Sequence, residues 1–217
     1  MTRVGKKAPN FSAPAVVGGG DGTLVPDFGL SQYLGRKDVL LFFYPKDFTF
    51  VCPTEIIAFQ ESLSEFEERS TSVVGVSTDT EETHLAWLKT PRKEGGIEGV
   101  TYPLVADTAK TISADYGVLG GTYIPSETGT SHSFKGIPIA FRGTFLIDKE
   151  GVIRHESVND LPLGRNIHEY LRLIDAMHHV DEYGEVCPAD WAKGESALSP
   201  TREGVSKYLA SKSGSKK

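Results

Sequence analysis

The feature that most constrains the fold is a run of six apolar residues at 39–44, Val-Leu-Leu-Phe-Phe-Tyr. An uninterrupted apolar run of this length is typical of a strand that is buried on both faces of a sheet. A helical pattern follows over 53–68, with apolar side chains spaced to form one buried face: Ile56, Phe59, Leu63 and Phe66. A buried strand that leads into an amphipathic helix is the repeating unit of an α/β fold.

The same alternation continues along the chain and predicts an α/β protein with parallel strand pairs. Asp79 or Thr80 is expected to cap the helix that carries Leu85 and Leu88. The final helix should bury Ile167, Tyr170, Leu171 and Ile174. We expect strands over 72–77, 102–106, 141–147 and 152–158, the last two forming a hairpin, and helices over 108–116 and 166–181.

Three stretches lack this periodicity. Residues 1–38 are rich in Gly and Pro, with a turn at 18–22 between two short extended pieces. Residues 120–140 are rich in Gly, Ser, Thr and Pro, which predicts a long surface loop. The polar residues 191–217 predict a loosely held C-terminal arm.

Composition limits the range of partners. The 217 residues are 39% hydrophobic, which suits one globular domain with an appendage. A formal net charge of −6 argues against nucleic acid, which requires a clustered basic surface. The only basic run is typical of a solvated tail: Lys207, Lys212, Lys216 and Lys217. No window is apolar enough to span a bilayer and the N-terminus lacks a signal-peptide pattern, so we expect a soluble, cytoplasmic protein without a membrane partner.

The two cysteines, Cys52 and Cys187, make a poor zinc site because neither belongs to a Cys-x-x-Cys pair. Cys52 stands where a loop becomes a helix, since Pro53 suits a first helical turn. The partial positive charge of a helix N-terminus favours a thiolate, which is a nucleophile. Thr49 can place its hydroxyl near the sulfur, and Pro45 can shield the sulfur from water. The alternative is a small buried cysteine that happens to begin a helix.

The spacing of Pro45, Thr49 and Cys52, followed by Pro-Thr-Glu at 53–55, resembles the active-site motif of the peroxiredoxins. The stretch 184–191, Gly-Glu-Val-Cys-Pro-Ala-Asp-Trp, is similar to the resolving-cysteine motif of their typical 2-Cys class. Two further stretches resemble that class: 141–148 and 158–165. Together these motifs cover nearly the whole chain.

The resemblance implies a thioredoxin-like fold, with a central mixed sheet flanked by helices and an extended C-terminal arm. Residues 1–165 would form the peroxidase domain, and 166–217 a helix and arm that carry the resolving Cys187. The implied reaction reduces hydrogen peroxide and organic hydroperoxides. Cys52 becomes a sulfenic acid, Cys187 of a partner subunit resolves it as a disulfide, and thioredoxin or a flavoprotein disulfide reductase reduces that disulfide. The resemblance also implies a homodimer, commonly five dimers in a ring, and this thiol chemistry needs no metal or other cofactor.

The resemblance assigns roles to other polar residues. Arg142 is similar to the family's active-site arginine, a fixed cation that would stabilise the thiolate and the charge on the leaving oxygen. Glu55 and Arg165 resemble the pair that orients it, although Glu55 also suits a helix cap. Tyr44 would offer a hydroxyl near the substrate or serve as a core tyrosine. We expect no catalytic histidine, because none of the six has an obvious partner, and we expect Trp87 and Trp191 to be packing residues.

The chain departs from the family pattern in three places. Glu98 interrupts the glycine-rich stretch 95–99, and Leu209 follows Tyr208 where a phenylalanine is expected. Both predict a looser arm and moderate resistance of Cys52 to over-oxidation. The connection 120–140 is longer than usual and has no assigned role.

Three rival functions differ in what they require. A thioredoxin-fold disulfide reductase needs Cys-x-x-Cys, but Pro-Thr-Glu follows Cys52. A Cys–His hydrolase needs a histidine partner for Cys52. A redox-sensitive holdase chaperone requires neither, and it would keep its activity when Cys52 is replaced by Ser. The sequence leaves open which peroxide is preferred and which reductase serves the protein.

Overall fold

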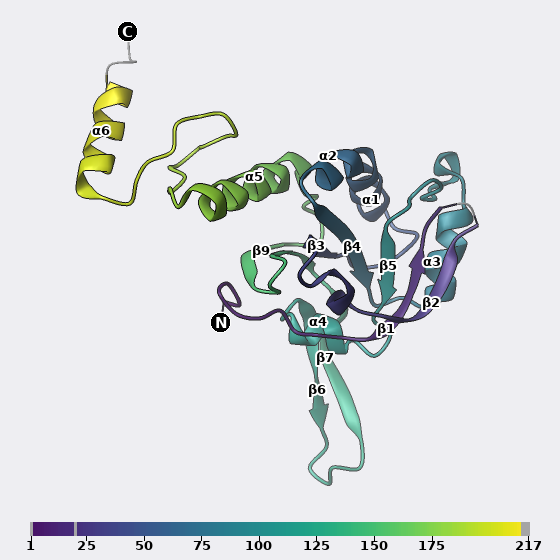
Figure 1. Ribbon diagram of the computed structural model, residues 1–217. Coiled ribbons are helices and arrows are strands. Elements are labelled where there is room, and N and C mark those ends of the chain that lie inside the picture. The colour runs from purple at the N-terminus through teal and green to yellow at the C-terminus, as the bar shows by residue number, and fades with distance from the viewer. Residues whose placement is uncertain (1, 20, 214–217) are drawn as a thin grey trace. The chain divides into compact units, whose positions relative to one another are not determined.

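The computed structural model describes residues 2–19 and 21–213 (Figure 1). The chain divides into two compact units, Met1–Ile167 and His168–Lys217. Gly20 of the predicted turn, and Lys216 and Lys217 of the basic run, lie outside the described residues. Among the residues that are described, none of the helices has the length and apolar character that crossing a membrane requires.

The first unit is built on a seven-stranded sheet with the order β2-β1-β5-β4-β3-β8-β9. The central strands β3, β4 and β5 run parallel, and the outer pairs are antiparallel. This arrangement confirms the predicted α/β class with a central mixed sheet. The strands are β1 (Ala13–Val17), β2 (Thr23–Phe28), β3 (Asp38–Phe43), β4 (Thr71–Ser77), β5 (Pro103–Ala106), β8 (Arg142–Ile147) and β9 (Ile153–Asn159).

Helices cover both faces of this sheet, as the apolar run in β3 predicts. Phe42 stacks on Phe59 of α1 with ring centroids 4.3 Å apart. The next residue, Phe43, points to the opposite face and packs on Tyr116, which follows α4. The helices are α1 (Cys52–Glu61), α2 (Leu63–Glu68), α3 (Glu81–Lys89), α4 (Thr111–Asp115), α5 (Ile167–Tyr183) and α6 (Arg202–Ser213), with 3-10 turns at Leu30–Tyr33 and Arg92–Glu94.

Two predicted helices differ from those observed. The single helix expected over 53–68 is interrupted at Ser62, which separates α1 from α2. The helix expected from residue 108 begins only at Thr111, because Lys110 has a φ of 60° and the Asp107 carboxylate accepts the backbone N–H of Ile112. The predicted cap of α3 is Thr80, whose hydroxyl accepts the N–H of Thr83.

The prediction of a surface loop over 120–140 is wrong. The segment forms an antiparallel hairpin of β6 (Leu119–Pro125) and β7 (His132–Ala140), which projects from the rest of the first unit (Figure 1). Gly, Ser, Thr and Pro obscure the strand signal in this sequence. The aromatic and β-branched residues between them are nevertheless typical of strands.

The polar C-terminal arm also contains more structure than predicted. Residues 202–213 form the helix α6, and Val186 pairs with Leu198 in an isolated antiparallel bridge. The burial predicted for one face of α5 is confirmed, since its four apolar residues are at most 6% exposed: Ile167, Tyr170, Leu171 and Ile174.

The sheet brings together residues that are distant in the sequence. Because β8 runs antiparallel to β3, with Phe42 opposite Thr144, the start of β8 lies beside the end of β3. The loop after β3 leads directly into α1, and β8 begins with Arg142. The fold therefore places the first turn of α1 next to the first residue of β8.

Candidate active site

Cys52 is the first residue of α1 and only 1% of its surface is exposed. Pro53 occupies the first turn, as predicted, and Val51 is the residue that precedes the helix. The sulfur therefore lies at the partially positive end of the helix dipole. Arg142 adds a full charge, because its Nη1 donates to the Cys52 sulfur across 3.5 Å. Both features place positive charge beside the sulfur, where it can stabilise negative charge that develops during a reaction.

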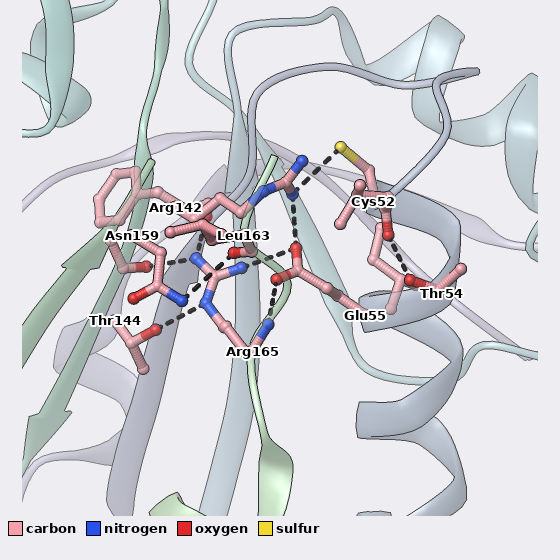
Figure 2. Close-up of polar contacts among 12 residues, drawn as sticks. Cys52, Thr54, Glu55, Arg142, Thr144, Asn159, Leu163 and Arg165 are labelled. Carbon is pink, nitrogen blue, oxygen red and sulfur yellow. Dashed lines mark hydrogen bonds and ion pairs between the residues drawn. The ribbon is translucent and has the colours of Figure 1, made fainter. Parts of the chain in front are cut away.

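The same nitrogen of Arg142 also donates to Glu55 Oε2 at 2.6 Å (Figure 2). Its Nε donates to the carbonyl oxygen of Leu161 at 2.7 Å, so the guanidinium is held from two sides. The side chains of Arg142 and Glu55 are only 4% and 2% exposed. Burial of this kind restricts the guanidinium to the orientation in which it faces the sulfur.

Arg165 fixes the other side of Glu55. Its Nη1 donates to Glu55 Oε2 at 2.8 Å, and its backbone N–H donates to Oε1 at 2.9 Å. Its side chain is fully buried, donates to Thr144 Oγ1 and lies over the ring of Phe42. It also donates to the carbonyl oxygens of Phe43 and Gly143. The Glu55 carboxylate therefore bridges two arginines. These contacts explain why a carboxylate stands at this position, without a role as a helix cap.

The three mutually bonded charged side chains at this site carry more positive than negative charge. Arg142 and Arg165 contribute two positive charges and Glu55 one negative charge, within a cluster almost closed to solvent. An unbalanced buried charge is costly because it has lost its hydration. A thiolate at Cys52 removes the excess positive charge. The cluster is therefore complementary to the nucleophilic form of the cysteine.

The loop between β3 and α1 carries three further predicted site residues: Tyr44, Pro45 and Thr49. Pro45 is buried, and the hydroxyl of Thr49 donates to the carbonyl of Lys46 at 2.9 Å. Tyr44 is fully buried and donates its hydroxyl to Asp47 Oδ1 at 2.9 Å. That contact supports the reading of Tyr44 as a core tyrosine.

Cys187 belongs to the second unit, and both cysteines are free thiols. Its sulfur lies 3.7 Å from the carbonyl oxygen of Ala176, to which the thiol donates. Partial burial raises the pKa of Cys187, and the negative charge of Glu185 raises it further, while Arg172 acts in the opposite direction. Glu185 in turn pairs with His179 at 3.0 Å. The neutral thiol is therefore the resting form of Cys187.

Comparisons with known proteins agree with this geometry. Residues 4–156 match the AhpC/TSA family, and residues 176–211 match the C-terminal domain of 1-Cys peroxiredoxin. Alkyl hydroperoxide reductase C of Helicobacter pylori is 50% identical over 206 residues, which cover 95% of this chain and 96% of the relative. The chain belongs to the 2-Cys peroxiredoxins. This membership confirms the predicted family and the predicted class of enzyme, a thiol-dependent peroxidase.

Other peroxiredoxins support the same assignment. Peroxiredoxin-2 of Mus musculus is 47% identical over 208 residues, 96% of each chain. The reduced 2-Cys peroxiredoxin of Plasmodium vivax is 44% identical and superposes with a TM-score of 0.85, covering 97% of this chain and 100% of that one. The likeness confirms the predicted thioredoxin-like fold.

One polar cluster of this peroxiredoxin escaped the sequence analysis, which found no partner for any histidine. His84 is fully buried, and its Nδ1 lies 2.7 Å from Asp47 Oδ2. Its Nε2 lies 3.3 Å from the carbonyl oxygen of Val105, so both ring nitrogens face oxygen acceptors. The backbone N–H of Asp47 donates to Asp79 at 2.6 Å. The expectation that no histidine has a partner is therefore wrong for His84, and also for His179, which pairs with Glu185.

A signal for this cluster is present in the sequence. His84, Trp87 and Leu88 follow the spacing of one helical face, and all three are buried in α3. A histidine at a buried helical position requires polar partners. Its partner Asp47, however, comes from a loop that only the tertiary fold brings near. Trp87 and Trp191 are buried, which confirms their prediction as packing residues.

Proposed function

We propose that this peroxiredoxin reduces hydrogen peroxide and organic hydroperoxides with the thiolate of Cys52 as the attacking group. One observation carries the proposal: the Arg142 guanidinium donates to both the Cys52 sulfur and Glu55 within a buried cluster. Arg142 is the positioned cation that such a reaction needs, and Glu55 and Arg165 hold it in place. Pro45 shields the sulfur and Thr49 orients the peroxide beside it.

The first step forms a sulfur–oxygen bond and breaks the oxygen–oxygen bond of the peroxide. The electron pair of that bond leaves with the distal oxygen, which takes a proton and departs as water or an alcohol. Negative charge grows on this oxygen in the transition state, and a fixed guanidinium stabilises it. The product on the enzyme is the sulfenic acid of Cys52.

The second step joins Cys52 to Cys187 of a second copy of the chain. The Cys187 sulfur attacks the sulfenic sulfur, a disulfide forms, and the hydroxyl leaves as water. A dithiol donor then restores both thiols by exchange. We propose thioredoxin or a flavoprotein disulfide reductase as this donor; a similar Plasmodium yoelii protein is called thioredoxin peroxidase I.

The proposed cycle also has consequences for the oligomeric state of the protein and for the cellular compartment in which it acts. Reciprocal donation of Cys187 requires at least a homodimer, and we propose that five dimers associate into a ring. A dithiol donor is available in a reducing compartment, which supports a cytoplasmic location. The two domains expected from the sequence divide the work in this proposal: residues 1–165 perform the peroxide chemistry, and 166–217 supply the resolving thiol.

The decisive experiment compares the wild-type protein with Cys52→Ser and Cys187→Ser variants. Wild type should consume hydrogen peroxide and cumene hydroperoxide continuously with a thioredoxin system. Cys187→Ser should consume one equivalent per chain and then stop, and Cys52→Ser should consume none. Continued turnover by the Cys52→Ser variant would exclude the proposed nucleophile. Comparing the two peroxides under identical conditions would also define the preferred substrate.

A further inference from the structure

The hairpin β6–β7 is a specified element of the fold, although the proposed reaction gives it no role. Tyr123 lies opposite Phe134, and their rings meet edge to face with centroids 4.9 Å apart. Gly121 lies so close to the opposite strand that a Cβ would come within 2.4 Å of the carbonyl oxygen of Lys135. Gly136 has a φ of 109°, which strongly favours glycine. A flexible loop without regular secondary structure would need neither the paired aromatic rings nor glycine at these two positions.

The tip of the hairpin is also ordered by its own sequence. The backbone N–H of Ser126 donates to the carbonyl of Ser131 at 2.8 Å, and that of Gly129 donates to Ser126. The hydroxyls of Thr128 and Thr130 lie 2.8 Å apart and form a further hydrogen bond. These contacts hold the turn without help from another element.

The sides of this hairpin are apolar and exposed. Tyr123, Ile124 and Ile137 are 53%, 40% and 46% exposed. The side chains of 119–140 that carry or can gain a charge near neutral pH are Glu127 and His132, which stand at the tip or beside it, and Lys135, which lies within β7 opposite Thr122. A two-stranded sheet alone is marginally stable in water, and edge strands normally carry charges that prevent pairing. The exposed stem is therefore suited to contact with another protein surface.

The base of the hairpin adjoins the proposed peroxide site. Leu119 pairs with Ala140, and the N–H of Phe141 donates to the carbonyl of Val118 at 2.8 Å. The residue after Phe141 is Arg142, which donates to Cys52. A protein that lies along the stem therefore reaches the surface around Cys52.

We infer that the hairpin is an interface arm that binds a second copy of this chain. The inference rests on the proposed function, in which Cys187 of a second copy must reach Cys52, beside the base of the hairpin. Because each copy supplies Cys187 to the other, their relation is reciprocal and hence two-fold. Both hairpins then meet the partner in the same way, and the exposed apolar side chains of the stem become buried.

The test replaces the exposed apolar side chains by charges while leaving the Tyr123–Phe134 pair intact. The variant carries Ile124→Lys and Ile137→Lys, and the matched control carries Leu24→Lys on β2, where Leu24 is 50% exposed. Copies labelled with donor and acceptor fluorophores report the rate at which reduced subunits exchange between dimers. The hairpin variant should exchange at least tenfold faster than wild type, because weaker interfaces dissociate faster. The control should exchange at the wild-type rate.

A second measurement separates this inference from the proposed function. A stoichiometric pulse of peroxide should oxidise Cys52 equally fast in wild type and variant, whereas formation of the disulfide should slow in the variant. Equal subunit exchange in all three proteins would overturn the inference, even if the disulfide forms normally. Equal exchange with a higher KM for the dithiol donor would assign the arm to the donor instead. A wild-type protein that forms no intersubunit disulfide would overturn the proposed function itself.

Discussion

A single nitrogen of Arg142 donates to two different acceptors, the Cys52 sulfur at 3.5 Å and the Glu55 carboxylate at 2.6 Å. The contact with the sulfur is longer and weaker than the contact with the carboxylate. The carboxylate therefore fixes the orientation of the guanidinium, and the positive charge of the guanidinium acts on the sulfur. Arg165 holds that carboxylate through two further bonds. Charge and orientation at this site therefore come from different residues, and replacing each should have a different effect.

Replacing Arg142 by Met should slow the second-order oxidation of Cys52 by at least tenfold. This corresponds to a loss of about 1.4 kcal/mol of transition-state stabilisation. Stopped-flow fluorescence with hydrogen peroxide measures this rate directly. Arg154→Met is the matched control, because that arginine is only partly buried and pairs with Asp148. An unchanged rate in Arg142→Met would reduce this residue to a structural role.

The resolving step offers a test based on the charge around Cys187. Burial raises the pKa of this thiol, Arg172 lowers it and Glu185 raises it, with a net increase, so more of the reactive thiolate forms as pH rises. Replacing Glu185 by Gln removes one raising influence, lowers the pKa and should speed disulfide formation at pH 7. Rapid-quench thiol trapping measures the step. Glu169→Gln on α5 removes the same charge at a different position and should not change the rate of disulfide formation. An equal increase in that rate in Glu169→Gln would contradict the assignment of the effect to Glu185.

At the scale of elements, sequence patterns were most reliable where burial and period agree. The apolar run of β3 and the helical spacing in α1 and α5 predict those elements, because the residues that each element buries follow one another at the spacing of that element. The hairpin β6–β7 was missed because its glycines and prolines serve close strand contacts that only the fold reveals. The pair of His84 and Asp47 is not apparent from the sequence for a related reason, since α1, α2 and β4 separate these residues along the chain.

This buried pair ties α3 to the loop that precedes Cys52, so its loss should affect both stability and catalysis. His84→Ala removes one hydrogen-bond partner of the buried Asp47 carboxylate, which typically costs about 1–3 kcal/mol, while Tyr44 still donates to that carboxylate. Urea unfolding should show a lower midpoint, and peroxide reduction should slow because the loop with Pro45 and Thr49 loosens. The exposed His132 provides the control, since His132→Ala should change neither quantity. If His84→Ala unfolds at the same urea concentration as the wild-type protein, the pair of His84 and Asp47 contributes nothing to the stability of the fold.

At the scale of the whole molecule, the proposed cycle joins Cys52 of one copy to Cys187 of another. The two cysteines of one chain belong to different compact units. Mixing two inactive variants tests the pairing between copies. A Cys52→Ser chain retains only Cys187, and a Cys187→Ser chain retains only Cys52, so neither can form an internal disulfide between these positions.

If the disulfide joins two copies, the mixed variants should form a covalent dimer after one equivalent of peroxide, visible on a non-reducing gel. Each variant alone serves as the control, and both should remain largely monomeric on that gel. Intact mass should show one disulfide per mixed pair, whereas wild type should form two, because two-fold symmetry joins each Cys52 to the opposite Cys187. A wild-type protein that loses both thiols yet migrates as a single chain would instead require the two units of one chain to meet.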